Sequence, residues 1–367
     1  MKEKIREEFL PLKNCFEKNH WAWKHSEDLE NNIVVKTKGD MFLYNYGDNV
    51  LVERNHPVLV KCRGIVVKSD GAVLNFPFER FFNSFEKECA VIDWETAVVQ
   101  EKVDGSLICV FWNGDSWEIS TRGSFYPTES ATVDFSDLFR EHFNHFEKLK
   151  KEYCYMFELV TKKNRIVTYY PDERVYLVGA RNLRDLKEVS RKDLDMISSD
   201  IGVLRPRLFD AKNMDECKKV FETLKKDDEG VVLVDAHFNR LKVKQESYLK
   251  LSKIRMLKEQ ELFEYVLGKI TIDVEYLHAF PDIVEEIEKI RIVWINAMKE
   301  VQKTFDAIKN IPTRKDFALK AVRYPYKSIL FLLLDGKDVS KAGIQFDDVK
   351  TWKKSSSGEL AERNRDA

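Results

Sequence analysis

The sequence has no paired-cysteine motif, no long hydrophobic run and no excess of charge of either sign. Its six cysteines are scattered, and none belongs to a C-x-x-C motif. This argues against a disulfide framework or a zinc ribbon and for reduced thiols in a cytosol-like compartment. The longest strongly apolar run, residues 329–334, is far too short to span a bilayer, and the charged start, residues 1–5, does not resemble a signal peptide. We therefore expect a cytoplasmic protein without membrane contact.

The charges nearly cancel, with 61 Lys and Arg residues against 62 Asp and Glu residues. Any surface that binds nucleic acid must therefore be local. One local excess is visible, because residues 240–258 contain seven basic residues and a single acidic one, Glu246. The length of 367 residues and the hydrophobic content of 44% predict two domains with real cores.

The stretch around Lys102 is the strongest candidate for a reactive site. The sequence K-V-D-G-S begins at Lys102 between two apolar runs, residues 97–99 and 107–111, which are typical of buried strands. The lysine is thus predicted at a strand end, a common place for a catalytic side chain. Free lysine titrates near pH ~10.4, so burial and neighbouring cations must lower its pKa before it can be a nucleophile. The alternative is an ordinary Asp-Gly surface turn.

Hairpins and helices are predicted around this stretch. Residues 69–71 and 113–115 carry hairpin turn signals between short strands. The second hairpin folds the chain back and brings Arg122 towards Lys102. Helical patterns cover residues 3–17, 133–151 and about 185–224.

Carboxylates and lysines recur in the strands that follow. Glu158 lies within an apolar strand, where a carboxylate is costly without a partner, so it is a candidate ligand for a hydroxyl or a cation. Glu229 and Gly230 open another buried strand. Lys242 and Lys244 share one face of a strand, because side chains alternate. Two such lysines repel each other unless an anion lies between them, which indicates a phosphate site; a solvated edge strand is the alternative.

The last third of the chain predicts helices alone. Apolar residues recur at spacings of three and four between residues 283 and 308, which indicates one long amphipathic helix. Pro281 suits the first turn of that helix, and Thr313 has the character of a cap for a later one. The strand pattern stops at about residue 245, so the C-terminal domain is predicted to be helical.

In order and spacing these motifs resemble those of the covalent nucleotidyltransferases: K-x-D-G, an internal Glu, E-G and K-x-K. The closer resemblance, over about residues 40–250, is to the type 1 RNA ligases of T-even phages. It is carried by residues 44–46, 62–65, 77–83, 102–107, 157–160, 164–167, 229–230 and 242–244.

Such a resemblance implies ATP-dependent joining of an RNA 5′-phosphate to an RNA 3′-hydroxyl, through lysyl-AMP and RNA-adenylate, in RNA repair. Lys102 matches the lysine that takes AMP, and Asp104, Gly105, Lys242 and Lys244 complete the implied catalytic set. Glu229 matches the residue linked to the metal, which is Mg²⁺ with Mn²⁺ as the alternative ion. The implied ATP-binding residues are Tyr44, Arg63, Arg80, Phe82, Lys102, Arg122, Glu158, Val178, Val232, Lys242 and Lys244, with Tyr248 beside the adenine.

Two positions depart from the family pattern. Arg80 and Arg122 stand where lysines are expected, and arginine keeps the charge but changes the geometry of the phosphate contact. In the implied chemistry the cations of Lys242 and Lys244 screen the phosphate oxygens. The same cations are expected to depress the pKa of Lys102.

The resemblance implies an α+β fold. We predict a nucleotidyltransferase domain of antiparallel sheets with flanking helices and an N-terminal extension over residues 1–250, an all-helical domain over 251–352 and a polar tail over 353–367. DNA ligases and capping guanylyltransferases share the lysine motif but continue with a β-barrel, and the helical pattern disfavours both.

The expected partners are RNA ends that carry a 5′-phosphate and a 3′-hydroxyl. We further expect a monomer, a functional pairing with an end-healing kinase-phosphatase, and a phage or host cytosol as its location; whether the RNA is a tRNA is left open. Two alternatives stand beside the RNA ligase. One is another lysyl-AMP enzyme, such as a DNA ligase or an AMP-transferase, and the other is a catalytically inactive RNA-binding relative.

Overall fold

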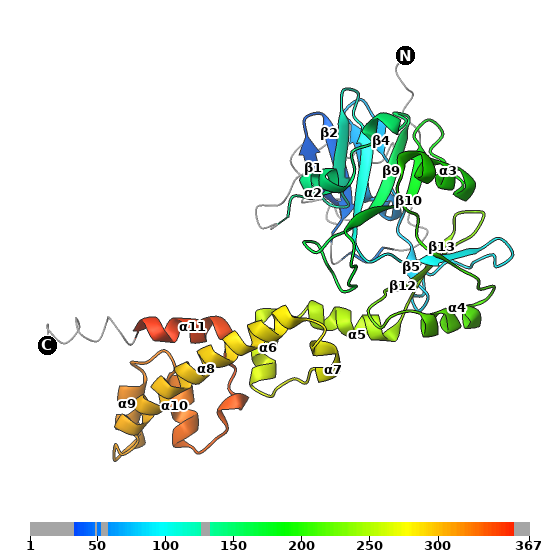
Figure 1. Ribbon diagram of the computed structural model, residues 1–367. Coiled ribbons are helices and arrows are strands. Elements are labelled where there is room, and N and C mark those ends of the chain that lie inside the picture. The colour runs from blue at the N-terminus through cyan, green and yellow to red at the C-terminus, as the bar shows by residue number, and fades with distance from the viewer. Residues whose placement is uncertain (1–32, 48–49, 53–57, 126–132, 356–367) are drawn as a thin grey trace. The chain divides into compact units, whose positions relative to one another are not determined.

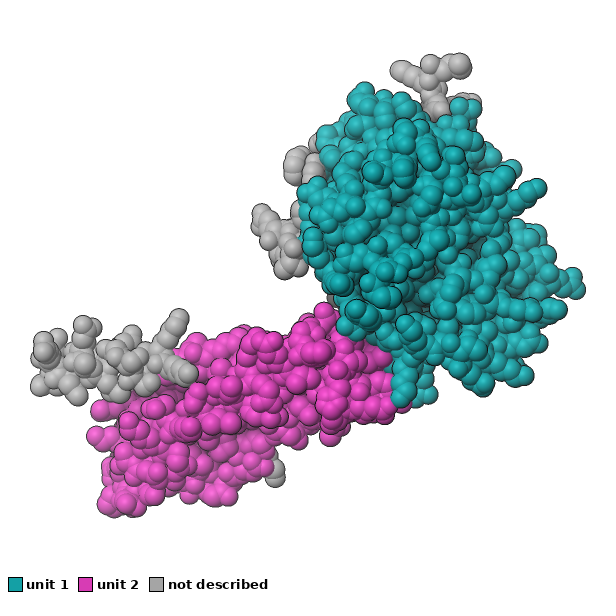
Figure 2. Space-filling view, in the orientation of Figure 1, with its two compact units in different colours: residues 1–249 teal, residues 250–367 magenta. Residues whose placement is uncertain are grey.

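A computed structural model describes residues 33–47, 50–52, 58–125 and 133–355 of the chain. The helix predicted over residues 3–17 and most of the predicted polar tail lie outside these residues. The chain forms two compact units, residues 1–249 and 250–367 (Figure 2), and each is described by itself. No helix in the described ranges is both long enough and apolar enough to cross a membrane.

The first sheet of unit 1 is a meander of four antiparallel strands. Its order is β1 (Ile33–Lys38), β2 (Met41–Tyr46), β3 (Arg63–Lys68) and β4 (Val73–Asn75) (Figure 1). A short 3₁₀ turn, η3 (Leu59–Lys61), precedes β3. The predicted hairpin at residues 69–71 is confirmed, since it joins β3 to β4. Apolar side chains of β2 and β3, including Tyr44 and Ile65, form a buried core on one face.

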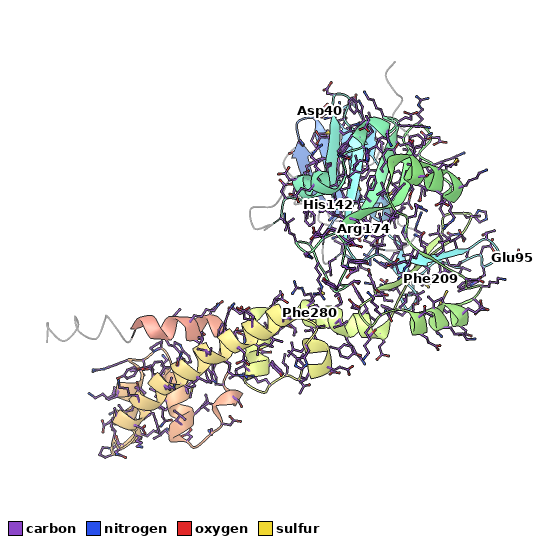
Figure 3. The ribbon with its side chains drawn as sticks, in the orientation of Figure 1. Asp40, Glu95, His142, Arg174, Phe209 and Phe280 are labelled. Atoms are coloured by element: carbon purple, nitrogen blue, oxygen red, sulfur yellow. The ribbon has the colours of Figure 1, made fainter. Side chains whose placement is uncertain are left out.

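The second sheet is also antiparallel and has the order β10-β9-β7-β8. The predicted hairpin at residues 113–115 is confirmed, because it joins β7 to β8 and the Asn113 amide donates to the Ser116 carbonyl at 3.1 Å. Phe157 and Leu177 are fully buried in its core, and Arg174 starts the last strand (Figure 3). The strands are β7 (Ser106–Trp112), β8 (Trp117–Thr121), β9 (Tyr153–Val160) and β10 (Arg174–Asn182).

The third sheet carries the lysine motif and has the order β11-β6-β12-β13-β5. Its pairs are antiparallel except for β13 with β5, which is parallel. Val99, Val231 and Leu233 are buried between this sheet and α4 (Met214–Val220). The strands are β5 (Phe82–Asn83), β6 (Val98–Glu101), β11 (Leu208–Phe209), β12 (Gly230–Val234) and β13 (Arg240–Lys244).

Two predicted helical stretches are wrong in extent. The helix expected over residues 133–151 is α2, Phe135–His142; Phe143 is extended, and a separate 3₁₀ turn, η4, covers Phe146–Lys148. Asn144 and His145, both poor helix formers, follow the helix end. The apolar period continues past it because Phe143 and Phe146 still pack on α2, with Phe139 centroids 5.4 and 6.4 Å away.

The stretch expected to be helical from about 185 to 224 is interrupted. Helix α3 (Arg191–Ile201) ends at Gly202 in the left-handed region. The strand β11 then pairs with β6, before α4 and the 3₁₀ turn η5 (Phe221–Thr223). A two-residue strand is too short to produce an alternating pattern, so only its pairing partner identifies it.

Unit 2 is helical throughout its described residues. Helix α8 (Pro281–Ile308) begins at a proline, as predicted, and buries Ile287, Ile290 and Val301. Around it pack α6 (Glu259–Val266), α7 (Val274–Leu277), α9 (Arg314–Ala321), α10 (Lys327–Leu334) and α11 (Phe346–Ser355). A 3₁₀ turn, η6, covers Val339–Lys341, and α5 (Glu246–Arg255) contains the division between the units. The predicted α+β class, with antiparallel sheets followed by helices, is confirmed.

Candidate active site

Lys102 is the first residue after β6, and its side chain is held by a buried carboxylate. Its backbone amide donates to the Gly230 carbonyl at 2.9 Å, which ties the end of β6 to the start of β12. Its Nζ lies 2.6 Å from Oε2 of Glu229, and Nζ of Lys244 lies 2.7 Å from the other oxygen, Oε1. The Glu229 side chain is only 4% exposed. One carboxylate therefore fixes the positions of two lysines that the sequence places far apart.

The ionisation of Lys102 differs from the prediction. Burial alone would lower its pKa, but the carboxylates of Glu229, Glu158 and Asp104 outweigh burial and raise the pKa of Lys102 above its ordinary value. The pKa shift of Lys102 is therefore opposite to the one that we expected from its neighbouring cations. The basic residues near the motif can be counted in the sequence, but Glu229 and Glu158 reach Lys102 only after the chain has folded.

The lysine whose pKa is lowered is Lys242. It lies with Lys244 on one face of β13, as the alternation predicted, and its Nζ is 5.1 Å from the centroid of the Phe81 ring. Burial, followed by the charges of Arg63, Lys102 and Lys244, lowers the pKa of Lys242 to about 8. A partly buried cation among like charges is stabilised by an anion, so the position suits a phosphate oxygen.

Glu158 faces the same region from β9. Its Oε1 accepts a hydrogen bond of 3.2 Å from the Gly105 amide. Burial, with the charges of Glu229 and Asp104, raises the pKa of Glu158 to about 7 against the opposing effect of Lys102. A carboxyl group that titrates near neutral pH can accept or donate a hydrogen bond, which suits the hydroxyl ligand predicted for it.

Asp104 fixes the lysine motif in place through hydrogen bonds. Its Oδ2 accepts hydrogen bonds from the amides of Val167 (2.9 Å) and Thr168 (2.8 Å), and its Oδ1 accepts one of 2.7 Å from the Tyr248 hydroxyl. The side chain is buried, at 4% exposure. These contacts hold Asp104 in a fixed position, and the catalytic role that the resemblance implied for it stays a prediction. Tyr248 is itself buried, at 3% exposure, and its implied place beside the adenine stays a prediction.

The backbone at Gly105 leaves no room for a side chain. A Cβ there would collide with the Leu159 carbonyl oxygen and lie 2.8 Å from Cγ1 of Val160. Glycine thus allows the chain after Lys102 to lie directly against β9. Gly105 thus lets the start of β7 approach β9 closely.

A cavity of about 590 Å³ opens beside Lys102. Of the predicted residues, its walls include Arg63, Arg122, Glu158, Val178 and Val232. It also contains Phe78 and Ile166, from motifs that carried the resemblance, and three residues to which sequence reasoning assigned no role in the site: Phe135, Pro206 and Arg240. Sequence reasoning did not place these residues in the site because they come from separate loops and strands, which are brought together only by the fold.

Three arginines surround one tyrosine at the edge of this cavity. Tyr46 accepts a hydrogen bond of 2.8 Å from Nη1 of Arg63, and the guanidinium groups of Arg80 and Arg122 lie 5.3 and 5.6 Å from its ring centroid. The Arg80 guanidinium also lies 4.9 Å from the centroid of the Phe82 ring. Burial, followed by the charges of Arg122 and Arg80, holds the pKa of Arg63 below its ordinary value despite Tyr46.

Tyr44, for which the resemblance implied a contact with ATP, is buried in the core of the first sheet, and the implied contact stays a prediction. It is 2% exposed and packs among the apolar side chains of the first sheet, while Tyr46 meets the arginines. Nε of Arg63 is buried and has no hydrogen-bond partner among the residues described. An anionic oxygen would satisfy this donor, so the arginine cluster fits a phosphate group.

The carboxylates near Lys102 fit a phosphate-bound magnesium ion and not a protein-only cage. Within the described ranges, no three His, Cys, Asp or Glu side chains lie close enough together to hold a metal. Mg²⁺ is usually held by one or two carboxylates together with substrate phosphates. Glu229, the predicted metal ligand, could supply such a carboxylate if a nucleotide supplied the phosphates.

Comparisons with known proteins find a family and relatives that are named as RNA ligases. The sequence profile of a family described as RNA ligase, of the phage T4 ligase 1 type, matches residues 61–249, just over half of the chain. A protein of Autographa californica nuclear polyhedrosis virus, named as a bifunctional polynucleotide kinase/RNA ligase, is 31% identical over 59% of this chain, but the match spans only 34% of that protein's length. An RNA ligase of Rhodothermus phage RM378 is 24% identical over 83% of this chain and 87% of its own. The solved structure of an archaeal ATP-dependent RNA ligase aligns with a TM-score of 0.47 and 13% identity, over 72% of this chain and 77% of its own.

Proposed function

We propose that this chain, which belongs to the RNA ligase family of the phage T4 ligase 1 type, is an ATP-dependent RNA ligase. The observation that carries the proposal is the network in which buried Glu229 binds Lys102 and Lys244, at a cavity whose walls include three arginines. A lysine nucleophile needs a fixed position, and a triphosphate needs several cations. The site supplies both requirements in one place.

In the first step, neutral Nζ of Lys102 attacks the α-phosphorus of ATP. A nitrogen–phosphorus bond forms, the bond to the pyrophosphate oxygen breaks, and the lysine proton is lost. Arg63, Lys242 and Lys244 are the residues of this chain that bind the phosphate oxygens and stabilise the charge that develops on them. Mg²⁺, held through Glu229 and the phosphates, supplies further charge neutralisation when bound.

In the next two steps AMP moves to the RNA and then leaves. The 5′-phosphate oxygen of the RNA attacks the phosphorus of lysyl-AMP, and the lysine nitrogen departs. The 3′-hydroxyl of the second RNA end then attacks the activated 5′-phosphate, so that a phosphodiester forms and AMP is released. Val178 and Val232 give the adenine an apolar wall, and Glu158 is the group available to the nucleoside hydroxyls.

We assign the adenylation chemistry to unit 1 and propose that the helical unit contributes to RNA choice. An end-healing kinase-phosphatase is the proposed functional partner, and the viral relative supports this because its name joins a kinase to a ligase. The proposed setting is RNA repair by a cytoplasmic monomer. A DNA ligase, another AMP-transferase and an inactive RNA-binding protein are the competing functions.

The test is transfer of label from ATP labelled at the α-phosphate, with Mg²⁺, to freshly de-adenylylated protein. Lys102→Ala removes the nucleophile, and Lys218→Ala, an exposed lysine on α4, is the matched control. We expect acid-labile label on the wild type and on Lys218→Ala but not on Lys102→Ala. Sealing of RNA strands in preference to DNA strands then separates the RNA ligase from the other lysyl-AMP enzymes. A wild type without label would overturn the ligase mechanism and favour the binding protein.

A further inference from the structure

A second cavity, of about 540 Å³, lies beside the one that contains Lys102. Phe81 and Arg240 line both cavities, so they share part of a wall. The second cavity is formed by the segment around β5, the turn between β12 and β13, and the segment at the end of β10 and after it. Its volume is within the range of ligand sites in proteins. None of the three reaction steps assigns a function to this second cavity.

The walls of this second cavity carry an excess of positive charge. Its lining contains four Arg or Lys side chains against two Glu side chains. Glu188 sits between two arginines, with Oε1 3.1 Å from Nη2 of Arg181 and 2.9 Å from Nη1 of Arg240. All three are largely buried, with side-chain exposures of 8%, 10% and 12% for Arg181, Glu188 and Arg240. Two guanidinium groups on one carboxylate leave a net positive charge with little water around it, which an anion would stabilise.

The turn between β12 and β13 presents an aromatic ring at this cavity. Phe238 has φ 61°, in the left-handed region that side chains other than Gly, Asn and Asp rarely adopt. Asp235 holds the turn, since its Oδ1 accepts hydrogen bonds of 2.9 Å from the amides of His237 and Asn239. A strained backbone persists only where its surroundings determine it. The result is a half-buried Phe238 ring that lines the second cavity and a smaller one of about 280 Å³ beyond it.

We propose that the second cavity binds the nucleotide next to the reacting end of a single-stranded RNA. Its base stacks on Phe238, and its phosphate lies near Lys187, Arg80 and Arg240. Sites for single strands combine a cationic groove with aromatic rings on which bases stack, and this cavity has both. The shared wall at Phe81 and Arg240 lets the strand continue to the cavity of Lys102. This proposal rests on the proposed ligase function and extends it to the RNA path.

The test is equilibrium binding of a short, unstructured, 5′-phosphorylated oligoribonucleotide with a 3′ fluorophore, measured by fluorescence anisotropy without ATP. Phe238→Asn removes the ring but keeps a residue that tolerates the left-handed region, and Phe238→Trp keeps a ring. Lys187→Gln removes an exposed cation of the cavity, and Lys218→Gln removes an exposed cation of helix α4 that does not line it. The rate of lysyl-AMP formation, which needs no RNA, is measured for every variant.

We expect Phe238→Asn to raise the Kd about tenfold, or about 1.4 kcal/mol, because loss of one stacked base is of that order. Phe238→Trp should stay close to the wild type. Lys187→Gln should reduce the slope of log K against log salt by about 0.7, the value for one phosphate contact on a single strand, and Lys218→Gln should not. Lysyl-AMP formation should be unchanged in all four variants.

Unchanged RNA affinity in Phe238→Asn, or equal salt slopes for Lys187→Gln and Lys218→Gln, would overturn the proposal while leaving the ligase function intact. If Phe238→Asn does not fold, as judged by circular dichroism, the comparison of the two lysine variants decides alone. A wild type that forms no lysyl-AMP would instead overturn the ligase function. The outcomes for the RNA site and for the enzyme are therefore distinguishable.

Discussion

At the scale of the residue, the ion pair between Lys102 and Glu229 keeps the proposed nucleophile in place and protonated. The 2.6 Å contact to a carboxylate that is 4% exposed stabilises the ammonium form, which cannot attack phosphorus. Reaction at neutral pH therefore requires this pair to weaken. Lys242, whose pKa is lowered to about 8 by burial and by neighbouring cations, lies where an anion would be stabilised.

The reactivity of Lys102 towards a small amine reagent should reveal this state. A carboxylate partner favours the charged form, so its removal should lower the pKa of Lys102 and raise the neutral fraction at a given pH. We expect Lys102 in Glu229→Gln to be acetylated several-fold faster by acetic anhydride than in the wild type between about pH 8 and pH 10. Mass spectrometry of the Lys102 peptide measures the rate, with the exposed Lys218 as the internal reference. A slower or unchanged reaction in Glu229→Gln would contradict the raised pKa.

At the scale of the element, the hairpin of β12 and β13 brings together most of the proposed chemistry. Glu229 precedes its first strand, Lys242 and Lys244 lie on its second, and Phe238 lies in its turn. Its register pairs Gly230 with Lys244, which sets Glu229 beside the lysine that it binds. A slip of one residue would turn both lysines to the opposite face, so the geometry of this hairpin determines the site.

Gly230 should be the most sensitive position of this hairpin. Its φ of 136° is open only to glycine, and a Cβ there would collide with the Val243 carbonyl oxygen and lie 2.9 Å from Cα of Lys244. We expect Gly230→Ala to lower the free energy of unfolding by about 4 kcal/mol or more, because strain and collision add. The matched control is Gly202→Ala, where φ is 69° and no atom lies within 4 Å of the new Cβ; strain alone should cost about 1–2 kcal/mol. Denaturant unfolding measures both, and equal costs would show that the close approach is unimportant.

At the scale of the whole molecule, the proposed adenylation site belongs to one unit. Lys102, Glu229, Lys244 and the cavity beside them are all drawn from residues before 250. Unit 2 has its own buried core around α8, where Phe263 and Trp294 meet with ring centroids 5.4 Å apart. Each unit thus has the interior that an independent fold requires.

A chain that ends after Leu257 should therefore still form lysyl-AMP. It retains every residue of the Lys102 network and the whole of α5, including Tyr248, which holds Asp104. We expect its rate of lysyl-AMP formation from labelled ATP to stay within an order of magnitude of the full chain. RNA sealing should fall further than adenylation if the helical unit contributes to RNA choice. A truncated protein that is folded by circular dichroism but takes no label would contradict the assignment of the chemistry to unit 1.

The sequence by itself determined the longer strands, the hairpins and the order of the motifs in this protein. Alternation and turn residues are local, so β7, β8, the turn at residues 113–115 and the common face of Lys242 and Lys244 could be predicted without contacts. The 283–308 stripe predicted α8 for the same reason, because a period of 3.6 residues needs no partner to be visible.

Only the tertiary structure decided which distant groups meet. Burial of Glu229 between Lys102 and Lys244 reverses the expected pKa of Lys102, and no local pattern contains that contact. Tyr44 and Tyr46 are both buried in the core of the first sheet, and the fold brings three arginines to Tyr46, which no local pattern predicts. Long-range pairing also placed β11 beside β6. Electrostatic energies depend on the distance and the burial of charges that lie far apart in the chain, and those quantities exist only once the chain has folded.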